Sequence, residues 1–368
     1  MSRPRGSVVA ARNPRGPAVL LLGAALLLLA TAASAQPFGA WMTLVGDPTN
    51  GWIAVPHSTA LNPTGAFTLE AWVAVSNNVS GEDCRSIAGK GFLSTWWIGQ
   101  CNVGGQPTLR SFLKGGGSAR NGGIIPRGVW THIAVVFTGS QRLHYINGEL
   151  AASFAESGPL TSGTAEVRIG NDANWNHTPA GAIDEVRLWN VARTQTQLRQ
   201  WINKHIASAQ PGLISLWPLD GNTADIIGGH NGAVGGSGVA ALTFPVALNC
   251  GASTVNQLCL QTRFAITTKW RTNPTPGTPT DGNGSFVVAS ANSGVGWFFS
   301  SDNWELLVKA LNACSLNNRY WVFSAATTDV FYRMEVFDIK AGVNKIYFNY
   351  PGAPAPAVTD TDAFATCP

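Results

Sequence analysis

Short segments of alternating apolar and polar residues run through this chain, and they constrain its fold more than any other feature. Phe67–Val75, FTLEAWVAV, is apolar at every second position, and Trp130–Phe137, WTHIAVVF, follows the same pattern. Leu143–Ile146 leads into Asn147-Gly148, a dipeptide suited to a tight hairpin turn. A period of two places one face of a strand in a core. Such strands, separated by glycine, proline and asparagine, predict an antiparallel all-β sandwich or jelly roll.

More strands of this kind are expected on both sides of these segments. They cover Trp52–Val55, Arg85–Ala88, Trp96–Gly99, Thr108–Leu113, Glu166–Ile169, Ile183–Trp189 and Leu213–Pro218, with a closing strand near Ala241–Phe244. One helix is expected among them, because Thr194 and Gln197 have the spacing of a capping box. Its apolar stripe follows at helical spacing, at Leu198, Trp201, Ile202 and His205.

A second strand series follows Cys259. It comprises Arg263–Trp270, Phe286–Ala289, Trp297–Phe299, Glu305–Leu311, Tyr320–Ser324, Phe331–Phe337 and Lys345–Asn349. The chain is therefore predicted to hold a jelly-roll sandwich over residues 36–248, a linker over 249–258 and a smaller all-β sandwich over 259–368.

The first 35 residues have the composition of a secretion signal. Four arginines precede the apolar run Val19–Ala30, and Ala33-Ser34-Ala35 predicts cleavage before Gln36. The alternative is a retained membrane anchor, but the run is short for a span of about 20 residues. We expect a mature protein without a membrane span, secreted or held at the cell surface or in the periplasm.

Removing this segment removes the positive charge. Four of the 24 Lys and Arg residues lie in it and none of the 20 Asp and Glu, so the mature chain has 20 of each. A neutral balance gives no reason to expect nucleic acid as a partner. The oligomeric state does not follow from the sequence.

All six cysteines lie beyond the signal, and an even number in an oxidising compartment predicts disulfides. Cys84 and Cys101 flank a predicted hairpin and form the most natural pair. The other four allow three connectivities, of which we favour Cys250–Cys259 with Cys314–Cys367.

Four segments, in this order, resemble laminin-G-like domains of the concanavalin A-like lectin/glucanase fold. They are FTLEAWVAV at 67–75, GVWTHIAVVF with LHYING at 128–148, GAIDEVRLWN at 181–190 and GLISLWPLD at 212–220. The resemblance covers roughly Phe38 to Leu248. It implies a jelly roll of two antiparallel sheets, in a family that includes sugar-binding, adhesion and metal-binding modules and, more distantly, hydrolases.

Residues 259–367 resemble a domain that recurs at the C-terminus of secreted bacterial proteins. The likeness lies in GWFFSSDNWELLVK at 296–309, NACSLNNRYWVF at 312–323 and TDTDAFATC at 359–367. It implies an extracellular, bacterial setting and no particular activity.

No catalytic motif is present, so we predict no catalytic residues and a protein that is not an enzyme. Glucanases of this fold carry an E-x-D-x-x-E-like strand, and no glutamate here heads such a pattern. Asp184 and Glu185 are adjacent, and simple strand alternation would put them on opposite faces of the sheet. They would then be unable to act as a paired dyad. Glu185 would form a surface ion pair with Arg187.

Alternation would turn Asp184 toward the core, where a carboxylate must be paired or metal-bound. Similar jelly-roll modules often hold a structural calcium at this strand, which implies a Ca²⁺ site with Asp184 and Asp47 as ligands. Further candidate ligands are Asp172, Asp220 and Asp225. The alternative is a carboxylate that accepts hydrogen bonds from backbone amides without a metal.

Sugar binding would need an exposed aromatic ring with polar neighbours. The loop at 171–177, NDANWNH, offers Trp175 beside Asn171, Asp172 and Asn174. Trp97 is a second candidate, because alternation would expose either Trp96 or Trp97. Packing under a loop is the alternative for each tryptophan.

These features predict a secreted, non-catalytic binding or adhesion protein for an extracellular glycan or protein. Two alternatives stay open, a glycoside hydrolase-like enzyme with an unrecognised carboxylate pair and a purely structural envelope protein.

Overall fold

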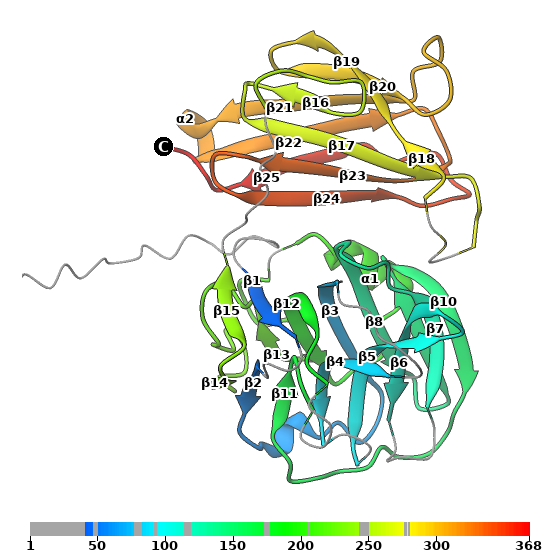
Figure 1. Ribbon diagram of the computed structural model, residues 1–368, viewed down its shortest axis with the longest axis vertical. Helices are drawn as coiled ribbons and strands as arrows, with labels where there is room; N and C mark the ends of the chain where they lie inside the picture. Colours follow the sequence, from blue (N-terminus) through cyan, green and yellow to red (C-terminus); the bar gives the residue numbers. More distant parts are fainter. Residues whose placement is uncertain are drawn as a thin grey trace, which may run out of the picture. The chain divides into compact units, whose positions relative to one another are not determined.

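The structure is a computed structural model that describes residues 41–46, 51–76, 83–91, 94–113, 119–172, 177–204, 206–242, 250–275, 278 and 280–368. The predicted signal segment lies outside these ranges, so its cleavage stays a prediction. The described strands form four antiparallel sheets, which confirms the all-β class (Figure 1). None of the helices in these ranges is both long and apolar enough to cross a membrane.

Two of the sheets lie between residues 41 and 242 and form what we call the first lobe. One sheet has the order β10–β9–β8–β3–β12–β1–β15, with β13 paired to β12, and the other has the order β14–β2–β11–β4–β5–β6–β7. The first sheet comprises β1 (Trp41–Val45), β3 (Phe67–Val75), β8 (Thr131–Phe137), β9 (Gln141–Ile146), β10 (Glu149–Ala155), β12 (Ala180–Trp189), β13 (Leu213–Trp217) and β15 (Val239–Leu242). The second comprises β2 (Gly51–Val55), β4 (Cys84–Lys90), β5 (Trp96–Val103), β6 (Gln106–Phe112), β7 (Arg120–Ile124), β11 (Val167–Ile169) and β14 (Ala233–Gly236).

The core of the first lobe lies between these two sheets. Leu69 and Val73 of β3 pack there with Ile133 of β8, and Ile53 and Ile98 reach the same cluster from the other sheet. The alternation in the sequence therefore correctly identified which face of β3 is buried. Thr68, Glu70 and Trp72 point to the opposite, outer face of their sheet.

The predicted helix forms as α1 (Gln195–Trp201). The hydroxyl of Thr194 accepts a hydrogen bond from the Gln197 amide at 3.2 Å, and the Gln197 side chain accepts one from the Thr194 amide at 2.9 Å. This capping box satisfies two amides that would otherwise lack partners. Leu198 packs against Ala134 and Val136 of β8, so α1 covers part of the outer face. A single turn of 3₁₀ helix, η1 (Thr59–Leu61), lies between β2 and β3.

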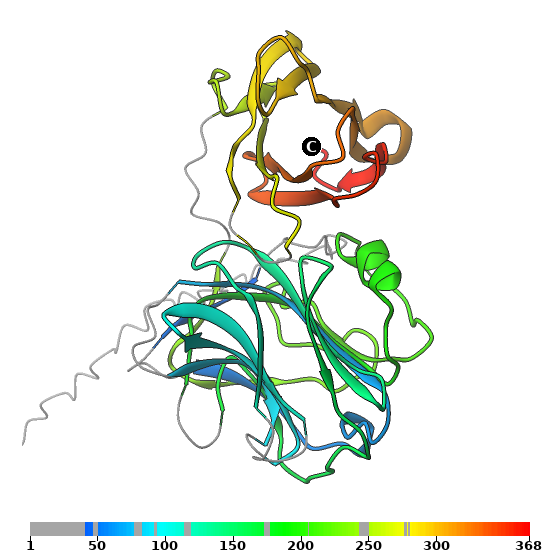
Figure 2. The ribbon, with the colours of Figure 1, turned by 90° about the vertical axis from the view of Figure 1, so that its right-hand side faces the viewer.

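The remaining two sheets form the second lobe and enclose a core of their own. One has the order β16–β17–β23–β24, with β18 paired to β17, and the other has the order β19–β20–β21–β22–β25. Their bounds are β16 (Leu258–Leu260), β17 (Phe264–Arg271), β18 (Gly282–Asn283), β19 (Ser285–Ser290), β20 (Ser293–Trp297), β21 (Leu306–Ala313), β22 (Arg319–Ala326), β23 (Phe331–Asp338), β24 (Val343–Asn349) and β25 (Val358–Phe364). A short helix, α2 (Cys314–Asn317), follows β21. The views in Figures 1 and 2 show the two sheets of this lobe facing each other across that core.

The structure contains the three favoured disulfides, Cys84–Cys101, Cys250–Cys259 and Cys314–Cys367. Cys84 and Cys101 are direct partners in the pairing of β4 with β5. Cys250, which was predicted to lie in a linker, is buried with Ala265 and Phe337. The segment at 250–259 is thus tied to the second lobe.

Candidate functional site

The adjacent carboxylates of β12 do not alternate between the two faces of their sheet. Asp184 lies opposite Trp72, whereas Arg187 lies opposite Glu70, so β12 has one residue more than β3 over this stretch. Glu185 takes up the extra residue as a β-bulge, with a φ of 50°. Ile183 and Val186 therefore both point into the core. The prediction that Asp184 faces the core was wrong, because simple alternation cannot account for an inserted residue.

Glu185 is also not the surface charge that was predicted. Its residue exposure is 1%, and its carboxylate accepts two hydrogen bonds from Arg187, at 3.1 and 2.7 Å. Arg187 in turn donates to the carbonyl oxygens of Trp201 and Lys204, each at 3.0 Å. This buried pair therefore holds the end of α1 against the sheet, and no substrate could reach its carboxylate.

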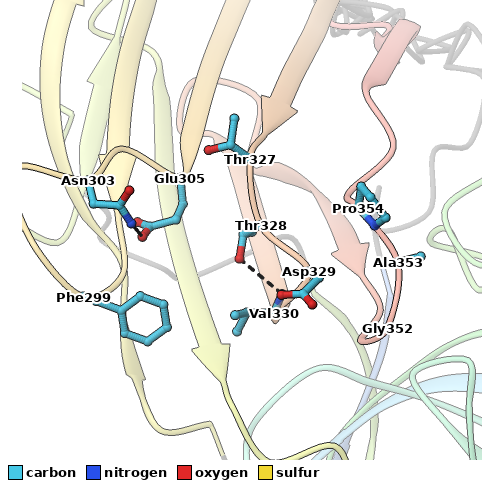
Figure 3. A pocket seen from close by; sticks show the side chains of 10 residues that line it. All are labelled: Phe299, Asn303, Glu305, Thr327, Thr328, Asp329, Val330, Gly352, Ala353 and Pro354. Atoms are coloured by element: carbon cyan, nitrogen blue, oxygen red, sulfur yellow. Dashed lines mark hydrogen bonds between the residues drawn. The ribbon is translucent and has the colours of Figure 1, made fainter.

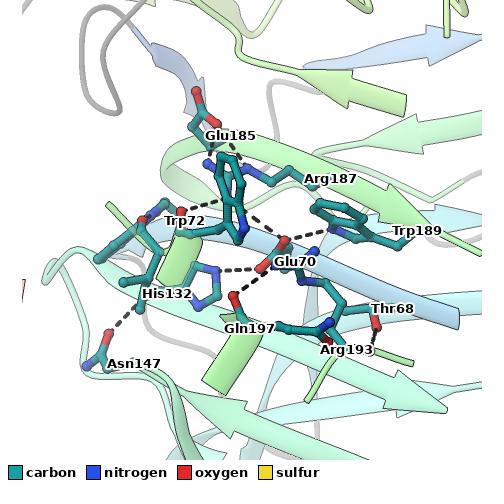
Figure 4. Close-up of polar contacts among 12 residues, drawn as sticks. Thr68, Glu70, Trp72, His132, Asn147, Glu185, Arg187, Trp189, Arg193 and Gln197 are labelled. Atoms are coloured by element: carbon teal, nitrogen blue, oxygen red, sulfur yellow. Dashed lines mark hydrogen bonds and ion pairs between the residues drawn. The ribbon is translucent and has the colours of Figure 1, made fainter. Parts of the chain in front are cut away.

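Glu70 is the centre of this buried network (Figure 4). Its carboxylate accepts a hydrogen bond from the Trp189 indole at 2.7 Å and lies 3.1 Å from Nε2 of His132 and 3.9 Å from Arg187. Burial would raise the pKa of Glu70, but the hydrogen bond with His132 and the charges of Arg187 and Arg193 lower it to about 2. Burial lowers the pKa of His132. We therefore assign a charged Glu70 and a neutral His132 that donates through Nε2.

Asp184 contributes to the same network through its charge. Burial would lower the pKa of Arg187, but the charges of Glu185, Glu70 and Asp184 raise it. The guanidinium of Arg187 thus interacts with Asp184, and the alternative that Asp184 accepts backbone amides stays a prediction. Asp47 lies outside the described residues, and within them no three His, Cys, Asp or Glu side chains are grouped to hold a metal ion. Calcium stays a prediction.

Two of the other proposed ligands have protein partners. Asp172 bonds His177, and Asp225 organises the turn after β13. The Asp225 carboxylate accepts backbone hydrogen bonds from Leu216, Ile227, Gly228 and His230, at 2.9 to 3.0 Å. Burial would raise the pKa of Asp225, and these amides lower it. Its role is to hold a turn.

Four polar side chains lie together at one end of the seven-stranded sheet, and the group they form is partly exposed. We call this group the rim cluster, and it consists of Asp83, Arg85, Asp172 and His177. Nδ1 of His177 is 2.9 Å from Asp172, and its Nε2 is 3.5 Å from Asp83. Arg85 donates to the other oxygen of Asp83 at 2.8 Å. The exposed fraction of the side chain is 38% for Asp83 and 19% for His177. Solvent molecules can thus reach this cluster.

Strand pairing brings the rim cluster together. β11 pairs with β4 in antiparallel register, with Ile169 opposite Ala88, so the chain after β11 runs back past the start of β4. The amide of Ser86 donates to the carbonyl of His177 at 2.8 Å and fixes the returning chain there. The disulfide at Cys84 anchors the same strand end to β5. Asp83 and Arg85 were not singled out in the sequence, although both flank this cysteine.

The structure separates the predicted sugar-binding residues. Asp172 belongs to the rim cluster, and Asn171 is buried beside it, with its side-chain amide bonded to Thr178 at 2.6 Å. Asn174 and Trp175 lie outside the described residues, so their role is untested. The ends of their loop are joined by the contact between Asp172 and His177.

The prediction that Trp96 or Trp97 is exposed was wrong. Trp96 lies in the core, and Trp97 is also fully buried although it lies on the opposite face of the strand. Its ring occupies the space that side chains at Gly89 and Gly99 would fill, beside Phe112. Its indole donates to Ser86 at 2.7 Å. Trp97 is therefore a packing residue beneath the rim rather than a ligand contact.

Sequence comparison identifies the first lobe. Residues 47–199 match a laminin-G family model, described as the concanavalin A-like lectin/glucanases superfamily. This part of the chain is similar to that superfamily. Three of the four segments that carry the resemblance lie within this match, and the fourth, at 212–220, lies beyond it. We call the first lobe the laminin-G-like domain.

Individual relatives match only parts of the chain. Mouse pappalysin-1 is 36% identical over 76 residues, which are 19% of this chain and 5% of that protein. A candidate carbohydrate-binding protein of Bacteroides ovatus has a TM-score of 0.46 and 23% identity, over 57% of this chain and 62% of its own. Domain 4 of the arabinanase AbnA of Geobacillus stearothermophilus has a TM-score of 0.34 and 23% identity, over 41% and 71%. These likenesses do not identify a ligand for this chain.

Proposed function

We propose that this chain is a non-catalytic binding protein of the cell exterior, and that its laminin-G-like domain holds an extracellular glycan at the rim cluster. The observation that carries the proposal is the built geometry of this cluster. Four side chains from two distant segments form a chain of contacts at the sheet end, with a carboxylate at each end of His177. Carboxylate, guanidinium and imidazole groups at an accessible edge can bind several sugar hydroxyls together.

Fixed ends of the loop at 171–177 support the same conclusion. The contact between Asp172 and His177 closes the loop before any ligand arrives. Binding then costs less ordering entropy than it would for a free loop. Trp175, the predicted stacking residue, lies between these two residues in the sequence.

The arrangement of carboxylates favours a binding protein over a hydrolase. Glycosidases need two carboxyl groups that face one cleft, about 5–10 Å apart. Glu70, Asp184 and Glu185 have residue exposures of at most 1% and belong to the buried network around Arg187. Asp83 and Asp172 are both engaged by His177. The three buried carboxylates therefore have structural partners in place of a substrate, and the two at the rim lie on either side of one imidazole.

A glycan array with the mature chain, followed by titration calorimetry of each positive glycan, tests the proposal. We expect saturable binding that Trp175→Ala weakens by about tenfold or more, the effect of losing one well-packed aromatic contact. Trp321→Ala, which removes a half-exposed indole from the second lobe, is the matched control and should bind normally. If no glycan binds, or Trp175→Ala binds as the parent does, the proposed site is wrong. Binding to extracellular proteins alone would support the adhesion alternative.

The calcium prediction has a separate test. Thermal melts of the mature chain in calcium and in chelator would differ if the ion stabilises the fold. The difference should vanish in Asp184→Ala, whatever the melting temperature of that variant. Equal melts of the parent protein under both conditions would end the prediction.

A further inference from the structure

The second lobe contains an open pocket at one end of its sandwich. Three connections form it, one between β20 and β21, one between β22 and β23, and one between β24 and β25 (Figure 3). Its volume is 540 Å³, within the range of about 300–1,000 Å³ that is common for small-ligand sites.

Phe299 supplies an exposed aromatic wall. The residue is 54% exposed, although its ring is held by an edge-on contact with Trp270 at 4.8 Å between ring centroids. Trp304, in the same connection, is 60% exposed. Its indole donates to the carbonyl of Ser301 at 3.0 Å. Exposed apolar surface beside a pocket can mark a ligand-binding site. Phe299 lines the pocket and its ring is held by Trp270, so stacking on it would cost little ordering entropy.

The polar wall of the pocket is formed by groups with hydrogen-bonding capacity to spare. Glu305 accepts the Phe298 amide at 2.7 Å and also bonds the side-chain amide of Asn303, which leaves the Asn303 carbonyl oxygen as an acceptor. The hydroxyl of Thr328 accepts the Val330 amide at 3.2 Å and can still donate its own proton. Among the described residues, Asp329 has no hydrogen-bond partner, and it is exposed.

The three connections are joined to one another before any ligand binds. Thr327 donates through its hydroxyl to the carbonyl of Trp304 at 3.0 Å and through its amide to that of Glu305 at 2.9 Å. Ala355 donates to the carbonyl of Thr328 at 3.1 Å. The aromatic and polar walls are therefore held at a fixed separation, as a preorganised binding site requires.

The charge of the lining selects the class of ligand. Glu305 and Asp329 are its ionisable side chains, and no Lys, Arg or His lines the pocket. An anionic ligand would be repelled by the two carboxylates, whereas sugar hydroxyls can donate to them in charge-assisted hydrogen bonds. The apolar face of a pyranose ring fits against an aromatic ring such as Phe299. We infer that this pocket is a second glycan site, specific for an uncharged sugar and separate from the rim cluster.

The test is titration calorimetry of the mature chain with two sets of oligosaccharides. The neutral set is derived from mannan, xylan, arabinan and laminarin, and the acidic set is derived from polygalacturonate. We expect at least one neutral oligosaccharide to bind, with affinity lowered about tenfold by Phe299→Ala and about threefold by Asp329→Asn. Phe323→Ala, a half-exposed phenylalanine on β22 outside the lining, is the matched control and should leave that affinity unchanged.

Each result decides between the two sites. A neutral oligosaccharide whose binding is weakened by Phe299→Ala and not by Trp175→Ala supports the second-lobe site, even if the rim proposal fails. Neutral binding that only Trp175→Ala weakens overturns the second-lobe site and supports the rim. Stronger binding of the acidic set, or no neutral binding at all, also overturns the inference. Unchanged melting temperatures of the Phe299 and Asp329 variants would exclude unfolding as the cause of any loss.

Discussion

Two of the carboxylate–histidine contacts in the laminin-G-like domain have similar lengths and very different surroundings. Glu70 and His132 are 3.1 Å apart and have at most 1% of their side-chain surface exposed. Asp172 and His177 are 2.9 Å apart at the rim, where the imidazole is 19% exposed. The same pair of groups thus serves two purposes. The buried contact belongs to the network around Arg187, which bonds the end of α1, whereas the rim contact leaves its imidazole partly exposed to solvent.

Removing Glu70 should have the largest effect on stability. Glu70→Ala would leave the Trp189 indole, His132 and part of the charge of Arg187 buried without their acceptor. We expect a loss of about 3–5 kcal/mol in the free energy of unfolding, measured by urea denaturation. Glu166→Ala, which removes an exposed carboxylate from Arg168, should cost less than about 0.5 kcal/mol. A loss at Glu70 as small as this control would contradict the structural role.

The second-largest effect on stability is expected from acid, which weakens the buried contact between Glu70 and His132. The pKa of Glu70 falls from an ordinary 4.5 to about 2 on folding, so its stabilisation is present above pH 4.5 and is lost as the pH falls toward 2. The full effect is about 3 kcal/mol. The lowered pKa of His132 adds to the loss below its ordinary 6.5, because the unfolded chain takes up that proton more readily. The free energy of unfolding, measured at a series of pH values between 7 and 2, should therefore fall as the pH is lowered. It should fall less in Glu70→Gln.

The sequence predicted those features of the fold that depend on residues close together in the chain. The buried face of β3 and the capping box of α1 were both predicted, because a period of two and a spacing of three residues are visible in the chain. The inserted residue at Glu185 was not, since its presence depends on how β12 pairs with β3. Asp172 was found as part of a polar loop. Asp83 and Arg85 were missed because the register of β11 against β4 brings them near this loop.

The same limit explains Glu70 and the second-lobe pocket. In the sequence, Glu70 is an ordinary polar position of an alternating strand, and its partner His132 lies 62 residues away. The pocket combines Phe299, Asp329 and Pro354 from three connections of the chain. Patterns in one sequence do not predict such contacts between distant residues, because the contacts depend on the order of strands in the sheets. The exposed Trp304 next to Glu305 was a signal that could have directed attention there.

Removing the rim disulfide should have a smaller effect on stability than removing Glu70. The bond between Cys84 and Cys101 closes a loop of 17 residues, for which the chain-entropy model gives about 3 kcal/mol. Their direct pairing in β4 and β5 should preserve much of the local structure, so the measured loss should fall below that value. Urea denaturation of Cys84→Ser/Cys101→Ser tests this. Glycan affinity should decline as well, since the disulfide fixes the strand end that carries Asp83 and Arg85.

The smallest change in stability, and the sharpest test of the comparison, is expected from Asp172→Asn. The amide keeps the shape and one acceptor for His177 but loses the charge, so we expect a loss of about 1 kcal/mol in unfolding free energy. If the rim cluster is a binding site, the affinity for a glycan whose binding depends on Trp175 should fall together with the unfolding free energy. Glu70→Gln should do the reverse, with lower stability and unchanged affinity of the folded protein. If Asp172→Asn and Glu70→Gln both lower stability and leave glycan affinity unchanged, the rim contact is structural, like the buried contact. Its greater exposure would then not make it a binding site.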